Sequence, residues 1–207
     1  EHTKAPHGTI VSISKLDNIQ NKSCRGFAET LSKKIRIIFN KFIDSGSCSF
    51  YVNGEKLSYF DTIGVKSGMC TQPLDEGYFD YNNTTIVWKA WYIPKTVQNA
   101  DFDDAFGRTN ANAGIYVYRQ WRLVGYGLDL GICHKSSQWT NGFRFELFID
   151  GTADKLFGTT FTKMITEKER NEIEVGFYEE LKRVAGPFVN QSIRMQKNET
   201  DDEKVTD

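Results

Sequence analysis

The sequence predicts an α+β domain with a mostly antiparallel or mixed β-sheet of four or more strands and two main helices packed on one face. Two segments repeat apolar residues at helical spacing, and several others alternate apolar and polar residues at a period of two. These segments follow the order strand, helix, hairpin, three strands, helix, which is typical of this class. A chain of 207 residues, 39% of them hydrophobic, is long enough to bury a core.

The first elements along the chain are a strand and a helix. Residues 8–16 alternate Ile and Val with Ser and Thr, which indicates a strand. Apolar side chains then recur at steps of three or four residues, which predicts a helix over residues 25–44 that ends at Gly46. The apolar stripe of this helix consists of Phe27, Leu31, Ile35, Ile38 and Phe42.

A hairpin and a central strand come next. Asn53-Gly54 separates the apolar runs 48–52 and 57–60, and this dipeptide tolerates the positive φ angles of a tight hairpin turn. Residues 62–83 are rich in Gly and Asn without a clear period, so we expect an irregular connection. Residues 84–93 are β-branched and aromatic, which predicts a strand.

Two further strands complete the predicted sheet. Residues 114–124 and 142–149 each alternate large apolar residues with Arg, Gln or Glu. This alternation is typical of a sheet with one buried face. On a single strand, Arg119 and Arg122 would point to opposite faces because they are three residues apart.

The last predicted element is a helix near the C-terminus. Thr166 and Glu169 have the spacing of a capping box. The helical stripe that follows consists of Ile173, Phe177, Leu181 and Val184. We expect the helix to stop before Gly186-Pro187, and residues 189–207 to form a charged tail or linker.

Composition narrows the class of protein. Lys and Arg total 26 against 27 Asp and Glu, which is not the basic excess of a dedicated nucleic-acid binder. The four cysteines lack the paired spacing of a zinc site, so we expect free thiols in a reducing compartment. No apolar run approaches the roughly 18 residues of a membrane span, and the first residues lack a signal core. We therefore expect a cytoplasmic protein without membrane contacts.

One segment has a pattern that favours the binding of an anion. Residues 150–163 place Asp154, Phe157 and Gly158 in a loop that ends on Lys163, just ahead of the predicted helix. The N-terminus of a helix attracts anions through its free N–H groups and its dipole, so Lys163 and the helix could together bind a phosphate. The spacing alone leaves open that Lys163 is a solvated surface residue.

Several short motifs follow one another along residues 7–188. They are Gly8-Thr9-Ile10-Val11 leading to Leu16, Tyr51-Val52-Asn53-Gly54 with Asp61 behind it, Gly114-Ile115-Tyr116-Val117-Tyr118-Arg119 with Arg122-Leu123-Val124, and the segment from Asp154 to Lys163. This succession resembles the transducer region of GHKL ATPases, the superfamily of gyrase, the heat-shock-ninety chaperones, histidine kinases and MutL. It is most similar to the MORC-like and chaperone-like bacterial members.

The resemblance implies roles for particular residues. Gly8 and Thr9 match the last nucleotide-side motif of the ATP-binding domain. Lys163 matches the lysine that reaches from the transducer to the γ-phosphate of ATP, so that it senses the nucleotide. Arg119 and Arg122 match the arginines of the signature strand, which implies a structural or interdomain role.

The resemblance also implies a domain organisation. Residues 1–22 would be the last strand of a truncated ATP-binding domain, 23–188 the transducer, and 189–207 the tail. The family's catalytic Glu, Mg-binding Asn and D-x-G-x-G motif precede the Gly-Thr strand, where this chain has only Glu1–His7. The chain alone is then expected not to hydrolyse ATP, and ATP and Mg are cofactors of the intact protein. The implied partners are the ATP-binding domain and a second copy of the intact protein, while the protein or DNA client stays unidentified.

An alternative function is a non-enzymatic module that binds protein or single-stranded nucleic acid. Its binding surface would be a sheet face with aromatic rings, on which bases or side chains stack. The rings in question are Trp88, Trp91, Tyr116, Tyr118 and Trp121. Alternation along the strands predicts that many of these rings lie in the core instead, and the near-neutral charge offers little attraction for nucleic acid.

Overall fold

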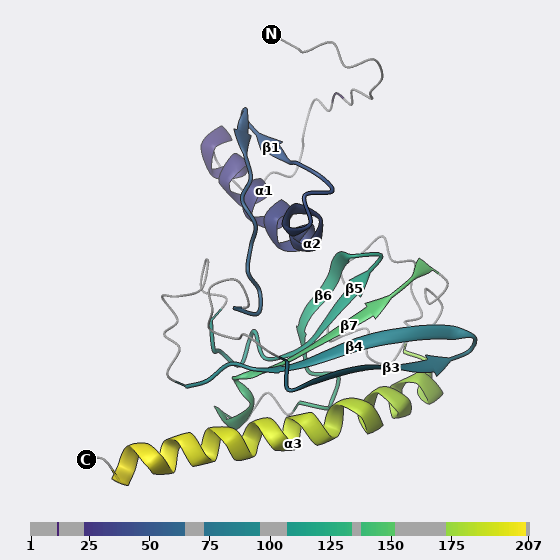
Figure 1. Ribbon diagram of the computed structural model, residues 1–207. Coiled ribbons are helices and arrows are strands. Elements are labelled where there is room, and N and C mark those ends of the chain that lie inside the picture. Colours follow the sequence, from purple (N-terminus) through teal and green to yellow (C-terminus); the bar gives the residue numbers. More distant parts are fainter. Residues whose placement is uncertain are drawn as a thin grey trace.

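The computed structural model confirms the α+β class (Figure 1). It describes residue 12 and residues 23–64, 73–95, 107–133, 138–151 and 173–205. The helices are α1 (Cys24–Ile38), α2 (Asn40–Asp44), the short 3₁₀ turn η3 (Gln138–Thr140) and α3 (Val175–Val205). The strands are β1 (Tyr51–Val52), β2 (Glu55–Lys56), β3 (Asp75–Tyr81), β4 (Thr84–Tyr92), β5 (Gly114–Arg119), β6 (Arg122–Leu128) and β7 (Phe143–Ile149).

Five strands form one mixed sheet in the order β3-β4-β7-β5-β6, and β1 and β2 form a separate two-stranded sheet. All neighbours are antiparallel except β5 and β7, which run parallel with Ile115 opposite Phe145. The predicted strands over 84–93 and 142–149 are confirmed as β4 and β7. Of the predicted strand 8–16 only Ser12 is described, and it belongs to neither a helix nor a strand.

The predicted irregular connection over 62–83 is wrong in its second half, where β3 forms an edge strand paired with β4. Asn82 and Asn83 make the turn between them with φ angles of 46° and 62°. Asn adopts this left-handed region more readily than most residues. Acidic side chains on the exposed edge hide the apolar alternation of β3, while Gly77 leaves room for the indole of Trp88 directly opposite.

The predicted single strand over 114–124 is also wrong, because β5 and β6 form a hairpin. Gln120 and Trp121 make its two-residue turn, with φ angles of 46° and 68°. Two-residue turns with positive φ at both positions favour Asn-Gly or Asp-Gly, so Gln-Trp gives no turn signal in the sequence. The predicted hairpin at Asn53-Gly54 is confirmed, with φ angles of 51° and 84°.

The predicted helix over 25–44 is confirmed in position but is divided into α1 and α2 at Phe39, whose φ and ψ angles are −107° and 22°. The Ser23 hydroxyl caps α1 by accepting a hydrogen bond from the Gly26 N–H. The first half of the apolar stripe is exposed, since Phe27 and Leu31 retain 40% and 38% of their accessible surface.

The predicted end of the last helix before Gly186-Pro187 is wrong, because α3 continues to Val205 with Pro187 inside it. The residues of its buried stripe are Phe177, Leu181, Ala185, Val189, Ser192 and Gln196. This stripe continues across Pro187, which lies on the exposed side, so packing against the sheet outweighs the lost N–H donor. The helix α3 begins at Val175, and the predicted capping box of Thr166 and Glu169 lies outside the described residues.

Helices lie on both faces of the sheet, which corrects the expectation that both main helices share one face (Figure 1). In β5, Ile115 and Val117 pack in the cluster that includes α3, whereas Tyr116 and Tyr118 pack in the cluster that includes Ile37 of α1. Because β5 is buried on both faces, the side chains that alternate with Ile115 and Val117 are aromatic rather than charged. No helix in the described part of the chain is long and apolar enough to cross a membrane.

Candidate functional site

The residues that the sequence singles out for nucleotide contact lie outside the described residues. These are Gly8, Thr9 and Lys163, together with the loop residues Asp154, Phe157 and Gly158. Their roles therefore stay predictions. The neighbouring signature strand and the strand that leads into residues 152–172 are both described.

The signature motif forms the β5–β6 hairpin. Arg119 and Arg122 are directly opposite each other in its register, so they share one face of the sheet, which corrects the expectation of opposite faces. β7 lies beside β5 and runs parallel to it, with Ile149 opposite Arg119. The Gln120 N–H donates to the Ile149 carbonyl at 2.9 Å, and a methyl group at Gly151 would lie 3.7 Å from Arg119 Nη2. The signature arginines thus lie where the chain leaves β7 toward Lys163.

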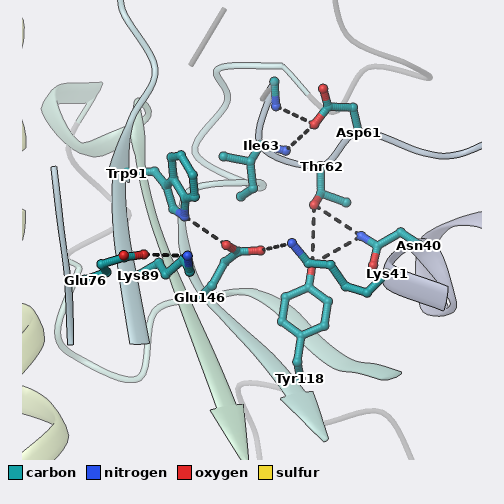
Figure 2. A network of polar contacts seen from close by, with 11 residues as sticks. Asn40, Lys41, Asp61, Thr62, Ile63, Glu76, Lys89, Trp91, Tyr118 and Glu146 are labelled. Atoms are coloured by element: carbon teal, nitrogen blue, oxygen red, sulfur yellow. Dashed lines mark hydrogen bonds and ion pairs between the residues drawn. The ribbon is translucent and has the colours of Figure 1, made fainter. Parts of the chain in front are cut away.

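A buried ion pair joins α2 to the opposite face of the sheet, the face that carries Tyr116 and Tyr118 (Figure 2). Lys41 Nζ lies 2.7 Å from Glu146 Oε1, and the indole Nε1 of Trp91 donates to Glu146 Oε2 at 2.9 Å. The Glu146 side chain is 1% exposed. The Lys41 ammonium also lies 5.1 Å and 5.7 Å from the ring centroids of Tyr118 and Phe148, within the range of cation–π attraction.

The charge of Lys41 depends on these neighbours. Burial alone would lower the pKa of its ammonium, but Tyr118 and Glu146 raise that pKa above its usual value. Lys41 therefore stays charged throughout the physiological pH range.

A second polar cluster joins α2 to β5 beside the ion pair (Figure 2). The Asn40 amide Nδ2 lies 3.2 Å from the Tyr118 hydroxyl and 3.3 Å from the Thr62 hydroxyl, and the two hydroxyls are 3.4 Å apart. The carboxylate of Asp61 accepts hydrogen bonds from the N–H groups of Ile63 and Gly64, which holds the turn that carries Thr62. Together these contacts fix the position of α2 on the sheet.

Arg144, one of the largest fully buried side chains, organises the other end of this face. Its guanidinium donates to the carbonyls of Asn141, Phe143 and Gly107 at 2.8–2.9 Å. Residues 107 and 141 are thereby held together, and the guanidinium stacks at 5.9 Å from the ring centroid of Tyr116.

Sequence reasoning missed Lys41, Glu146 and Arg144 as residues of a buried network. Arg144 and Glu146 alternate with Phe143 and Phe145, so the pattern assigns them to a solvated face. In the structure they are 0% and 1% exposed, because α1, α2 and the residues around Thr62 cover that face. The local sequence around two charged residues on a strand does not indicate that distant elements bury them.

The stability of this face is expected to fall at alkaline pH. Burial raises the pKa values of Tyr116 and Tyr118, whereas phenols of the unfolded chain ionise at about pH 10. Above that pH the unfolded state binds fewer protons than the folded state, so the free energy of unfolding falls as pH rises. We expect a loss of about 3 kcal/mol per pH unit from the two phenols, and full stability below about pH 10. Urea unfolding followed from about pH 9 to 11 measures it.

The substitution Tyr116→Phe serves as the control for this prediction. It removes one buried phenol and should reduce the slope above about pH 10 by about 1.4 kcal/mol per pH unit. A free energy of unfolding that does not change over this pH range would contradict the burial of these hydroxyls.

A cavity of about 450 Å³ lies beside the ion pair. Its lining residues are Lys41, Asp44, Tyr59, Ile63, Val87, Lys89, Trp91, Trp121, Glu146 and Phe148. Trp121, at the β5–β6 turn, is 61% exposed, and its ring centroid lies 5.6 Å from that of Phe148. The cavity therefore opens at the same hairpin that carries the signature arginines.

The proposed aromatic platform for nucleic acid is not formed by the rings that the sequence offers. Trp88, Trp91, Tyr116 and Tyr118 are all 8% exposed or less, and they divide between the two faces of the sheet. Only Trp121 of this set is exposed. Buried rings cannot stack on bases, so this set does not make a continuous binding surface.

A scan of the chain against protein-family models finds no match, and a search of the curated proteins finds none either.

Proposed function

We propose that this chain is the transducer part of a GHKL-type ATPase, which senses the γ-phosphate of ATP through Lys163 and relays the nucleotide state to domain closure or dimerisation. One observation supports the proposal. The hairpin that carries the signature motif lies beside β7, and β7 leads directly into the segment that contains Lys163. The hairpin motif and the strand that precedes the lysine segment in the sequence are thus neighbours in the sheet.

The chemistry of this proposal is electrostatic. A lysine ammonium supplied by a second domain is attracted only when the γ-phosphate is present, so its contact distinguishes ATP from ADP. The ATP-binding domain of the intact protein would supply Mg²⁺, the metal-binding Asn and the catalytic Glu. Lys163 would then stabilise charge on the phosphate and hold the two domains together.

Both ends of the lysine segment are fixed to the sheet, which supports the relay. At its start, Gly151 follows β7 and lies beside Arg119 and Gln120. At its end, Glu174 accepts a hydrogen bond from the Tyr81 hydroxyl at 2.8 Å and a second from Asn82 at 3.2 Å, both at the β3–β4 turn. A force on Lys163 would therefore reach the sheet at two points.

The ion pair between Lys41 and Glu146 couples movements of the sheet to α2. Glu146 belongs to β7, the strand that leads to Lys163, and it holds Lys41 of α2 at 2.7 Å. A shift of β7 would move α2 with it, because separating the pair would leave a buried carboxylate without its cation. This coupling supports a mechanical role for the fold.

The test is ATP hydrolysis by the complete natural protein with Lys163→Ala. We expect kcat to fall by about 100-fold, since this is the usual loss when a donor to the transition-state charge is removed. Dimerisation with a non-hydrolysable ATP analogue, measured by light scattering, should be lost as well. Lys155→Ala is the matched control because it removes a lysine from the same segment, and its kcat should stay near that of the wild type.

Two outcomes would overturn the proposal. One is a complete protein that does not hydrolyse ATP. The other is a Lys163→Ala variant whose hydrolysis and dimerisation equal those of the wild type.

A further inference from the structure

The cavity beside the ion pair has the composition of a small-molecule site. Its volume of about 450 Å³ lies in the range of ligand pockets, and its walls are mostly aromatic and aliphatic. Trp91, Trp121 and Phe148 supply three aromatic rings, and Ile63 and Val87 supply aliphatic surface. Flat walls of this kind favour a planar aromatic guest.

The charged groups of the cavity are unequally available to a ligand. Both carboxylate oxygens of Glu146 are used within the protein, one by Lys41 and one by Trp91. The ammonium of Lys89 forms an ion pair with Glu76. Each oxygen of Glu146 therefore already has one partner inside the protein.

Lys41 differs from these groups because its ammonium has three hydrogens, and the ion pair with Glu146 uses one of them. Its side chain is 20% exposed and lines both the 450 Å³ cavity and a neighbouring cavity of about 340 Å³, in which Asp44 and Trp121 recur. A charged donor thus lies between the two cavities, next to aromatic walls.

We propose that this cavity binds a small planar aromatic molecule that carries a carboxylate, with its ring against Trp91, Trp121 and Phe148 and its carboxylate accepting from Lys41. The aromatic walls select the ring, and the fixed ammonium selects the anion. The lining holds two ammonium groups, Lys41 and Lys89, and two carboxylates, Asp44 and Glu146, so its formal charges balance and the choice of an anion rests on the hydrogens of Lys41. This site does not depend on the nucleotide function proposed above.

The experiment uses 2-naphthoate as the probe and the four indole N–H groups of the chain as reporters, observed by NMR with the full chain. Trp→Phe variants assign the four signals. We expect 2-naphthoate to shift the signals of Trp91 and Trp121 with a Kd of about 1 mM or tighter, the affinity typical for a ligand of this size. Trp88 and Trp139 serve as internal controls, since Trp88 packs against Phe145 and Phe188, and Trp139 near Lys197.

One neutral and one cationic analogue with the same ring system test the role of Lys41. 2-Naphthylmethanol lacks the charge, and 2-(aminomethyl)naphthalene reverses it. We expect the alcohol to bind at least about fivefold more weakly than 2-naphthoate, as charge-assisted hydrogen bonds are about twice as strong as neutral ones. The amine should bind more weakly still. Equal or tighter binding of the amine would overturn the proposal in favour of a site for cations.

Substitutions test the location. Trp121→Ala removes an exposed wall of the cavity without opening the core and should weaken 2-naphthoate binding at least about fivefold. Tyr51→Ala is the matched control, because Tyr51 is equally exposed at 60% but lies on β1, outside the cavity lining. The proposal is wrong if 2-naphthoate does not saturate, if it shifts Trp88 or Trp139 as strongly, or if Trp121→Ala binds it like the wild type.

Discussion

The substitution Glu146→Ala is expected to lower the free energy of unfolding by about 3 kcal/mol, because it leaves the ammonium of Lys41 without its counter-charge in a largely buried position. The same change removes the acceptor of the Trp91 indole N–H. An unpaired buried donor adds to the cost. Urea unfolding at neutral pH measures the loss.

The double variant Lys41→Met/Glu146→Gln distinguishes two contributions to the free energy of unfolding. One is the penalty of leaving a buried charge unpaired, and the other is the net stabilisation by the ion pair. The amide oxygen introduced by Glu146→Gln would still accept from Trp91, and Met in place of Lys41 fills a similar volume without a charge. We expect the double variant to be more stable than either single variant and to lie within about 1 kcal/mol of the wild type. If its loss equals the sum of the two single losses, the side chains do not interact in solution.

A matched control lies one strand away. Lys89 and Glu76 form an ion pair on the same face, but their side chains are 38% and 56% exposed. Water screens this pair, so Glu76→Ala should change the free energy of unfolding by less than about 1 kcal/mol. A similar loss at both positions would mean that the burial of Glu146 is not what makes its pair important.

The sequence predicts the elements whose signals are local. Apolar spacing indicates α1 and the middle of α3, Asn53-Gly54 indicates a hairpin, and β-branched and aromatic residues indicate β4. It misses β3 because acidic residues at an exposed sheet edge hide the alternation of that strand. It also misses the β5–β6 turn, since Gln120 and Trp121 adopt positive φ angles only through the pairing of the flanking strands.

The side chains of the site are buried by helices that are distant from β7 in the sequence, and the local sequence pattern does not indicate this burial. An alternation of Phe with Arg144 and Glu146 is the pattern of a half-exposed strand, and the pattern does not reveal that helices cover both faces. Pro187 is a second example, because the local sequence predicts that a helix ends there. Its helix persists because the buried stripe continues beyond it to Gln196, which accepts a hydrogen bond from Arg108 at 2.8 Å and donates to the Gln138 carbonyl at 2.9 Å.

Phe177 and Phe27 each belong to a predicted helical stripe, but the structure buries only Phe177. Phe177 is 0% exposed and packs 5.7 Å from the ring centroid of Tyr81 and 6.1 Å from that of Phe79. We expect Phe177→Ala to lower the free energy of unfolding by about 4 kcal/mol, since it creates a cavity between α3 and the sheet. Phe27→Ala should cost less than about 1 kcal/mol, because that ring is 40% exposed.

Urea unfolding of both variants, followed by far-UV circular dichroism, measures the difference. The two substitutions delete the same side chain from a helix, so helix propensity contributes equally and only burial distinguishes them. A small loss for Phe177→Ala would contradict the packing of α3 on the sheet. A large loss for Phe27→Ala would show that the first half of the apolar stripe of α1, exposed among the described residues, is covered in solution. The helical spacing in the sequence would then have identified a buried face there.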